Sequence, residues 1–382
     1  MDLKNLEGDI DMKSSEKKNG KRIVLSVIAI AVIAAMVSIM ILSAVRAEDG
    51  VPQLESSHDS HDATKAQAES EIKETAIPVQ DQTSTAAQKD KPEIPEEEQE
   101  VKEMKRPGGD SSVAHIRRRP GVSPDYKKIE KIGSEFAVVL DADKNEIVAG
   151  KQAAKRMFPA SLTKVMTLVT AVDFLESMDA EFSLTLEESD FFYREQAAAA
   201  GYEPGEKALA GDMLYGLILP SGADCALGLA KVTAGDEKRF ADLMNLEAVK
   251  MGLRDTHFTN PVGLHDDQNY STPIDLAVIY RYAMDNELCR KVLGTPDYTM
   301  EKTKEHPEGL QVWSHTFGFM TGVDMNGFTV TGGKVGYTQE ARSCFVTSAE
   351  KNGRTFIVVT GYGQGNSGMC ADHIEIYKNL VV

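Results

Sequence analysis

The 382-residue sequence is poor in cysteine, histidine, tryptophan and positive charge. It has eight histidines and one tryptophan, and it contains 59 acidic but only 42 basic residues. The resulting net charge of −17 argues against a nucleic-acid partner, because phosphate binding needs a basic surface. The spacing of the four cysteines is typical of neither a zinc ribbon nor a disulfide framework, so we expect free buried thiols. These cysteines are Cys225, Cys289, Cys344 and Cys370.

Long apolar runs are also scarce, with one exception at residues 23–45. An uncharged helix of that length can cross a hydrocarbon core of about 30 Å. Basic residues at 17–22 precede it, and Glu48 and Asp49 follow it. The positive-inside bias therefore predicts a cytoplasmic tail at 1–22, a single membrane anchor at 23–45 and an extracytoplasmic remainder, at the cell membrane. Signal-peptidase cleavage after Ala47 is the alternative.

Residues 46–125 are rich in Glu, Lys, Gln, Ser, Ala and Pro and almost lack aromatic side chains. Such a composition cannot bury enough apolar surface to offset the entropy of folding, so we expect a disordered extracytoplasmic linker. His58 and His61 resemble metal ligands in type, but a flexible polar tether is a poor frame for a metal site.

Residues 126–382 have the composition of one folded domain, and their pattern predicts an α+β fold. Two β-prone runs at 136–140 and 146–149 flank a turn and predict a hairpin. Helical periodicity follows Pro159 and recurs at 209–219, 223–232 and 240–251. Strands are expected at 344–348 and 355–360, and a final amphipathic helix from about Asp372.

Ser161 and Lys164 form a Ser-x-x-Lys tetrad at the start of the helix after Pro159. Residues three apart share one face of a helix, so the amine can lie beside the hydroxyl and act as its base. Burial and a second nearby cation would both lower the lysine pKa and favour that role. The tetrad alone is weak, because four other Ser-x-x-Lys matches occur in the chain. A surface serine and lysine on an amphipathic helix is the alternative.

Two later motifs supply partners for this pair. Ser221 lies in a break between two helical stretches, where a hydroxyl can reach a cleft and pass a proton, although a helix N-cap is the competing role. Residues 332–338 (GGKVGYT) combine glycines, which allow close backbone approach, with Lys334, which can hold a carboxylate. A tight turn with a solvated lysine is the alternative for this segment.

Together these motifs resemble the low-molecular-mass serine D-alanyl-D-alanine carboxypeptidases, the penicillin-binding proteins that trim peptidoglycan stem peptides. Residues 158–167 (FPASLTKVMT) resemble the nucleophile helix of that family, 214–222 (LYGLILPSG) its second motif and 333–338 (GKVGYT) its third. Residues 260–264 (NPVGL) resemble a further family segment. The resemblance implies a serine β-lactamase/DD-peptidase-like fold, an antiparallel sheet flanked by helices with an all-helical subregion. The family usually has an additional C-terminal β-rich domain, which we do not expect here, because the sequence ends shortly after the last expected helix.

The resemblance implies a role for each matched residue. Ser161, Lys164 and Ser221 are the expected catalytic residues, with no metal or other cofactor. Lys334, Gly336 and Thr338 are the residues expected to bind substrate. Peptidoglycan stem peptides are the expected substrates, and β-lactam antibiotics the expected acylating inhibitors.

Two departures from the family pattern weaken the expected site. Ala223 replaces an Asn of the second motif, and Val335 replaces a Thr of the third. Loss of one hydrogen bond in a buried site typically costs about 1–3 kcal/mol, which slows a catalyst without abolishing it. A module that binds peptidoglycan or a cell-wall partner without turnover is therefore an alternative. A β-lactamase is the third possible function. It would need fast deacylation, and the sequence shows no clear motif for a glutamate dedicated to that step.

Overall fold

The computed structural model describes residues 119–380 of the chain. The expected cytoplasmic tail, the anchor at 23–45 and most of the expected linker lie outside the described residues. Within residues 119–380, no helix has the length and apolarity to cross a membrane. The first strand begins at Gly121, five residues before the expected domain boundary at 126.

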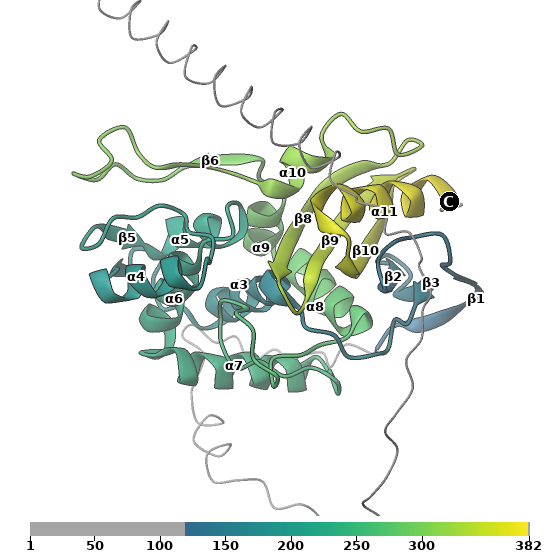
Figure 1. Cartoon of the computed structure of the whole chain (residues 1–382), viewed down its shortest axis with the longest axis horizontal. Helices are drawn as coiled ribbons and strands as arrows, with labels where there is room; N and C mark the ends of the chain where they lie inside the picture. Colours follow the sequence, from purple (N-terminus) through teal and green to yellow (C-terminus); the bar gives the residue numbers. More distant parts are fainter. Residues whose placement is uncertain (1–118, 381–382) are drawn as a thin grey trace, which may run out of the picture. The chain divides into compact units, whose positions relative to one another are not determined.

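The strands and helices fall into three consecutive parts of the chain: N-terminal strands, a mainly helical central part, and a C-terminal part that contains strands β6 to β10 (Figure 1). The N-terminal strands are β1 (Gly121–Lys128), β2 (Phe136–Asp141) and β3 (Glu146–Lys151). The central part contains η1 (Ala160–Leu162), α3 (Thr163–Phe174), β4 (Glu181–Ser183), α4 (Leu186–Arg194), β5 (Lys207–Leu209), α5 (Ala210–Ile218), α6 (Ala223–Ala234), α7 (Glu237–Lys250), α8 (Pro273–Asp285) and α9 (Glu287–Leu293). The C-terminal part contains β6 (Asp297–Thr299), β7 (Gln311–Trp313), α10 (His315–Met320), β8 (Thr329–Thr338), β9 (Arg342–Lys351), β10 (Arg354–Gly363) and α11 (Gly365–Asn379).

Six strands form the main sheet in the order β1-β3-β2-β10-β9-β8, so N-terminal and C-terminal strands meet at its centre. β2 pairs with β3 and with β10 in antiparallel register, which confirms the expected hairpin. β1 alone pairs in parallel, with β3. β8 is the opposite edge, paired on one side with β9.

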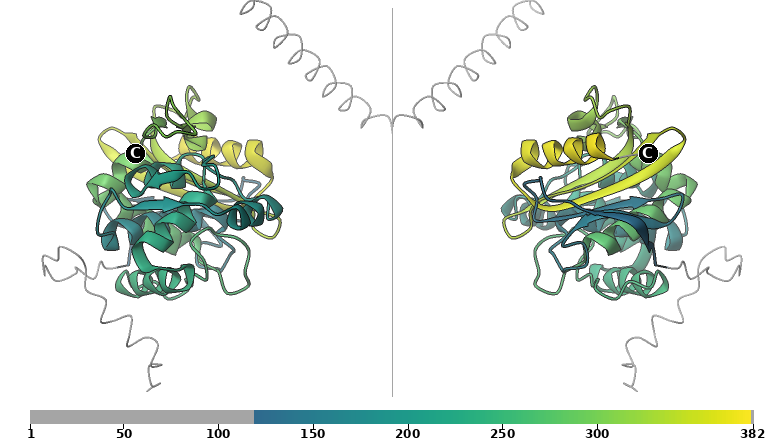
Figure 2. Two further views of the ribbon diagram at one scale, coloured as in Figure 1. Left: turned by 90° about the vertical axis from the view of Figure 1, so that its left-hand side faces the viewer. Right: turned by 90° about the vertical axis from the view of Figure 1, so that its right-hand side faces the viewer.

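Helices cover both faces of this sheet, and Figure 2 shows α11 on one side and the central helices on the other. Val138 and Leu140 of β2 belong to the larger core, which also holds the apolar side chains of α3 and α8. The alternate residues Ala137 and Val139 belong to a smaller core against α11. Because successive strand residues face opposite sides, β2 is buried along its full length. The expected α+β architecture is confirmed.

The helical region contains the expected helices as α5, α6 and α7, with the predicted break at 219–222. The expected start of the final helix was wrong, because this helix begins at Gly365 rather than near Asp372. Residues 332–338 are the end of strand β8, so the alternative of a tight turn for this segment is also wrong. The third motif is therefore presented by the edge of the main sheet.

Candidate active site

A pocket of about 630 Å³ lies where the start of α3, the α5–α6 break and the end of β8 meet. Ser161, Lys164 and Ser221 line it together with Gly336 and Thr338. Five of the six residues predicted for the site are thus brought to one cavity from segments far apart in the sequence. Lys334 is not among the lining residues, although its strand neighbours Val335 and Gly336 are, and 1% of its surface is exposed.

The expected pair of hydroxyl and amine is in hydrogen-bond contact. Lys164 Nζ lies 3.1 Å from Ser161 Oγ and donates a second hydrogen bond of 2.7 Å to the Val262 carbonyl oxygen. Ser161 belongs to the 3₁₀ turn η1, and Lys164 is the second residue of α3. The turn places the hydroxyl one helical turn before the amine, and both residues line the pocket.

Burial alters the protonation of Lys164. Only 1% of its surface is exposed, and burial lowers its pKa to about 7, against the opposing attraction of Asp224 and Cys225. An ammonium in a dry site loses its hydration, so the neutral amine is favoured. A lysine with this pKa is about half neutral near pH 7, as a general base requires. The alternative of a solvated surface pair is therefore wrong.

Two residues of the site have left-handed backbone conformations. Ala160, directly before the serine, has φ of 48°, and Ser221 has φ of 67°. Such conformations are unfavourable for residues with a Cβ atom and persist where the surrounding structure holds them. Gly263, at φ of +82°, leaves room for this turn, because a Cβ there would lie 2.2 Å from the Ala160 carbonyl oxygen.

Ser221 does not cap the helix that follows it. The N-cap of α6 is Gly222, which has no side chain to make a capping bond. Ser221 instead lines the pocket, with 5% of its surface exposed. Ala223, where the family pattern has Asn, is fully buried and donates its N–H to the Ala198 carbonyl oxygen at 2.7 Å.

Strand β8 contributes the third motif. Burial lowers the pKa of Lys334 well below its ordinary value, and the charge of Lys164 lowers it further. Lys334 Nζ donates to the Val335 carbonyl oxygen at 2.8 Å, so the alternative of a solvated lysine is wrong. Gly336 packs against the nucleophile turn, because a Cβ there would lie 2.8 Å from the Ser161 backbone nitrogen.

Val335 and Thr338 complete this wall of the pocket. Both are half-buried lining residues. The Thr338 hydroxyl oxygen accepts a hydrogen bond of 3.0 Å from the Ala341 N–H. A hydroxyl can donate while it accepts. A side-chain hydrogen bond from Thr338 is among the influences that lower the pKa of the exposed Glu340 carboxyl, after the backbone hydrogen bond of Glu340 itself.

Sequence reasoning missed several groups of the site. The Val262 carbonyl binds Lys164 across 98 residues of sequence. His315 also lines the pocket, and its pKa is lowered by burial and by Lys334. For the Val262 carbonyl, the one available indication in the sequence was the resemblance of residues 260–264 to a family segment. For His315 no indication existed in the sequence.

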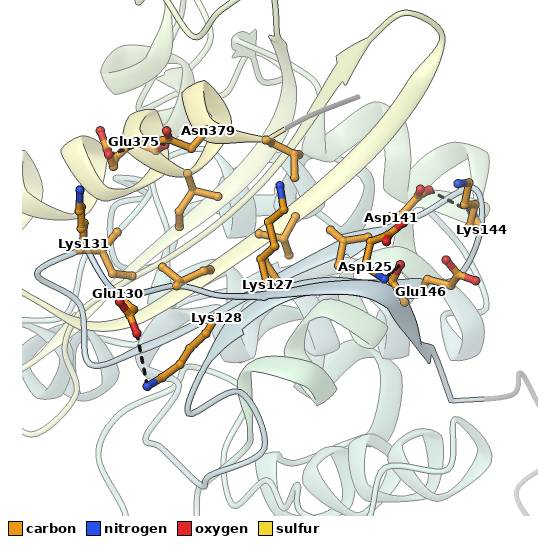
Figure 3. Close-up of a pocket in the computed structure, with 18 of the residues that line it drawn as sticks. Asp125, Lys127, Lys128, Glu130, Lys131, Asp141, Lys144, Glu146, Glu375 and Asn379 are labelled. Atoms are coloured by element: carbon orange, nitrogen blue, oxygen red, sulfur yellow. Dashed lines mark hydrogen bonds and ion pairs between the residues drawn. The ribbon is translucent and has the colours of Figure 1, made fainter.

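The described residues contain no cluster of three or more potential metal ligands. The four cysteines are free; three are buried and Cys370 is half-buried, which largely confirms the expectation of buried thiols. A further cavity of about 720 Å³ lies between β1 and the end of α11. Figure 3 shows it ringed by charged side chains such as Lys127, Lys131 and Glu375, and none of the predicted site residues lines it.

Comparison with known proteins agrees with the geometry of the pocket. Residues 122–362 match the family model described as D-alanyl-D-alanine carboxypeptidase. D-alanyl-D-alanine carboxypeptidase DacF of Bacillus subtilis is 32% identical over 241 residues, which cover 62% of this chain and 60% of the Bacillus protein. The D-alanyl-D-alanine carboxypeptidase of Streptomyces sp. K15 is 33% identical over 217 residues, 54% of this chain and 73% of that protein.

Solved structures show the same fold. The crystal structure of the Streptomyces K15 DD-transpeptidase has a TM-score of 0.59 and 29% identity, and the match covers 65% of this chain and 98% of that one. The D-alanyl-D-alanine carboxypeptidase of Mycobacterium tuberculosis has a TM-score of 0.56 at 26% identity, over 68% and 95% of the two chains. The family match covers more than half of the 382 residues, so the chain belongs to the D-alanyl-D-alanine carboxypeptidase family.

Proposed function

We propose that this protein is a serine D-alanyl-D-alanine carboxypeptidase that uses Ser161 as its nucleophile and removes the terminal D-alanine of peptidoglycan stem peptides. The observation that carries the proposal is the 3.1 Å contact between Ser161 Oγ and the buried Lys164 Nζ, two residues that line the same pocket. Membership of the family supports the same reaction.

Acylation begins when the neutral Lys164 amine takes the proton of the Ser161 hydroxyl. The Oγ atom then attacks the carbonyl carbon of the peptide bond between the two D-alanines. Negative charge develops on the carbonyl oxygen, and backbone N–H groups that include that of Ser161 stabilise it at the start of the helix. The retained hydrogen bond to the Val262 carbonyl keeps Nζ oriented toward Oγ throughout.

The tetrahedral intermediate collapses when the bond to the leaving nitrogen breaks. Ser221 helps return the proton to that nitrogen, and free D-alanine departs. Lys334 attracts the carboxylate of the terminal D-alanine, with Gly336 and Thr338 forming the adjacent wall. Water then hydrolyses the acyl-enzyme. Since β8 is an edge strand, it also offers unpaired backbone groups to an extended peptide.

Ala223 and Val335 reduce the polar contacts available to a substrate. Each missing hydrogen bond corresponds to roughly a ten- to hundredfold loss in rate or binding. We therefore expect turnover that is slow but measurable, and acylation by β-lactams, whose strained amide is attacked in the same way.

The location that we propose is the outer side of the cell membrane, with residues 23–45 as a single-pass anchor. The apolar run and the flanking charges support it. Fractionation of cells that produce the full chain should find it with the membranes, and deletion of residues 1–45 should remove it from them. Recovery of the full chain in the soluble fraction alone would contradict the anchor.

The reaction itself is tested with a peptide that ends in D-Ala-D-Ala. The wild-type chain should release D-alanine, and Ser161→Ala should release none above the uncatalysed rate. Equal release by both proteins would exclude Ser161 as the nucleophile. Absence of release by either, at substrate concentrations in the millimolar range, would exclude the carboxypeptidase.

A further inference from the structure

The peptide unit between Val262 and Gly263 connects the expected base to a side chain for which the reaction above has no role. Its carbonyl oxygen accepts the hydrogen bond of 2.7 Å from Lys164 Nζ. Its N–H, which belongs to Gly263, donates a hydrogen bond of 2.7 Å to Asn260 Oδ1. The unit is planar and trans, so the carbonyl and the N–H point to opposite sides of it. A group that holds the N–H therefore also sets the direction of the carbonyl.

The Asn260 amide is itself held on both sides. Besides the bond at Oδ1, Nδ2 donates to the Leu264 carbonyl oxygen at 3.1 Å and to Thr259 Oγ1 at 3.3 Å. The amide oxygen meets an N–H and the amide nitrogen meets a carbonyl oxygen, so these partners permit one orientation of the side chain. Asparagine often shapes a turn through such local bonds to the backbone. Asn260 closes the turn at 260–264 with an acceptor and a donor, which neither an ionised carboxylate nor an aliphatic side chain supplies together.

The same turn packs against the nucleophile. The Pro261 carbonyl oxygen accepts a hydrogen bond of 2.7 Å from the hydroxyl of Thr167, which lies three residues after the base in α3. A Cβ on Gly263 would lie 2.2 Å from the Ala160 carbonyl oxygen and 3.1 Å from the Ser161 backbone nitrogen. Because no space remains between these segments, a change in the turn is transmitted to both members of the Ser-Lys pair.

The direction of the Val262 carbonyl matters for proton transfer. A neutral lysine amine has two N–H donors and one lone pair, and the lone pair must be free to take the proton of Ser161. A carbonyl oxygen engages one of the donors, whereas an N–H in its place would engage the lone pair. Gly263 has φ of +82°, and a glycine backbone changes conformation more readily than other residues do. The peptide unit therefore needs a hydrogen bond to hold its direction.

We propose that Asn260 is a positioning residue, which holds the peptide unit 262–263 with its carbonyl toward Lys164 and so directs the amine to Ser161 Oγ, 3.1 Å away. The proposal rests on the proposed function, because it takes Lys164 as the base. Asn260 is half-buried and is not among the residues that line the pocket. Its loss should therefore slow the chemical step more than it weakens binding.

The test is the acylation of Ser161 by a fluorescent penicillin, measured on the full chain as wild type and as Asn260→Ala. Rates over a range of penicillin concentrations separate the limiting acylation rate from the half-saturating concentration. Misdirection of the base should lower the limiting rate by roughly ten- to hundredfold, and the half-saturating concentration should stay near its wild-type value. An unchanged limiting rate, or a loss confined to the half-saturating concentration, overturns the proposal.

Asn245→Ala is the matched control. Asn245 of α7 is also half-buried, and its Oδ1 accepts the Phe258 N–H while its Nδ2 donates to the Phe258 carbonyl oxygen, both at 2.8 Å. These bonds hold the same segment of backbone but do not involve the peptide unit 262–263. Their loss should lower stability in urea denaturation and leave the limiting rate near the wild-type value. An equal loss of rate in both variants would mean that any loosening of the segment slows acylation, which also overturns the specific role of Asn260.

Hydrogen exchange of the Gly263 amide separates this inference from the carboxypeptidase proposal, because it needs no acylation. The amide should be protected in the wild-type full chain and in Lys164→Met, since Asn260 rather than the lysine holds the peptide unit. It should exchange faster in Asn260→Ala. Exchange in the wild-type chain as fast as in an unstructured peptide overturns the proposal, even where Asn260→Ala fails to fold. Loss of protection in Lys164→Met, or retained protection in Asn260→Ala, would assign the anchoring to another contact and overturns it as well.

Discussion

At the scale of single residues, the buried Lys164 lines the pocket, and a second buried lysine, Lys334, lies on the strand β8 that forms one of its walls. Lys164 and Lys334 are each 1% exposed, and burial lowers the pKa of both. The pair therefore does not carry two full positive charges near neutral pH. In the proposed reaction, a substrate carboxylate beside Lys334 would favour its charged form, so we expect proton uptake to accompany substrate binding.

The first prediction concerns the pH dependence of the wild-type chain. In the proposed mechanism the neutral amine of Lys164 is the base, and burial lowers its pKa to about 7, so the acylation rate should rise as pH increases through that value. The rate constant for reaction with a fluorescent penicillin, measured between about pH 5.5 and 8.5, checks this. A flat profile over the same range would mean that Lys164 is not the base.

Val335 provides a second residue-scale prediction. Val335→Thr restores a hydroxyl of nearly the same volume at a lining position, so binding or acylation should improve by up to about tenfold. The control is Val330→Thr, on the same strand but outside the lining residues, which should leave the rate unchanged. No gain from Val335→Thr would show that the hydroxyl of Thr338 already fills the role.

At the scale of elements, sequence patterns predicted segments that are locally periodic and missed those that are not. The helices α5, α6 and α7 have apolar residues at helical spacing, and β2 and β3 are β-prone runs around a turn. β1 is mostly polar and exposed, and Gly332 and Gly333 favour a turn, although β8 pairs through both with β9. The start of α11 was missed because Gly365, Asn366 and Gly368 are poor helix formers, and the first buried residue of this helix is Met369.

The contact between β8 and η1 supports an element-scale prediction. Gly336→Ala would place a methyl group 2.8 Å from the Ser161 nitrogen, so either the strand or the nucleophile turn must move. A displacement of about 1 Å can cost roughly a hundredfold in rate, and we expect a loss of that order in acylation. Gly318→Ala, where a Cβ meets nothing within 4 Å, should be neutral. Wild-type rates for Gly336→Ala would refute the close packing.

The helix α11 supplies a prediction about stability. His373 is fully buried between Thr347 of β9 and Thr360 of β10, each 3.0 Å from one ring nitrogen, and burial lowers its pKa to about 3. The folded state therefore binds no proton there between pH 6.5 and 3, whereas the unfolded state does, and stability is lost as pH falls through this range.

From pH 7 to pH 5 the contribution of His373 amounts to about 2 kcal/mol. Urea denaturation of the wild-type chain and of His373→Gln at the two pH values should show a smaller loss in the variant, by that amount. His257→Gln, at a half-buried histidine bonded to the Gln268 carbonyl, should behave as the wild type does. An equal loss in all three proteins would exclude His373 as the acid-sensitive group.

At the scale of the whole molecule, the fold joins chemistry that the sequence keeps apart. The tetrad Ser161-x-x-Lys164 and the residues Ser221 and Lys334 were identifiable as local motifs. The contacts that give them their properties were not, since the Val262 carbonyl acts on Lys164 across 98 residues and Asp224 holds Ala200 across 24. These contacts depend on how α6, β8 and the 259–265 segment pack against α3, which no local pattern encodes.

The most direct test of the central claim is the site of covalent attachment of penicillin. The full chain is incubated with benzylpenicillin, digested, and its modified peptide is located by mass spectrometry. The account predicts one penicilloyl group on Ser161, and none on Ser161→Ala under the same conditions. Attachment at another residue, or no attachment to the wild-type chain at millimolar penicillin, would contradict it.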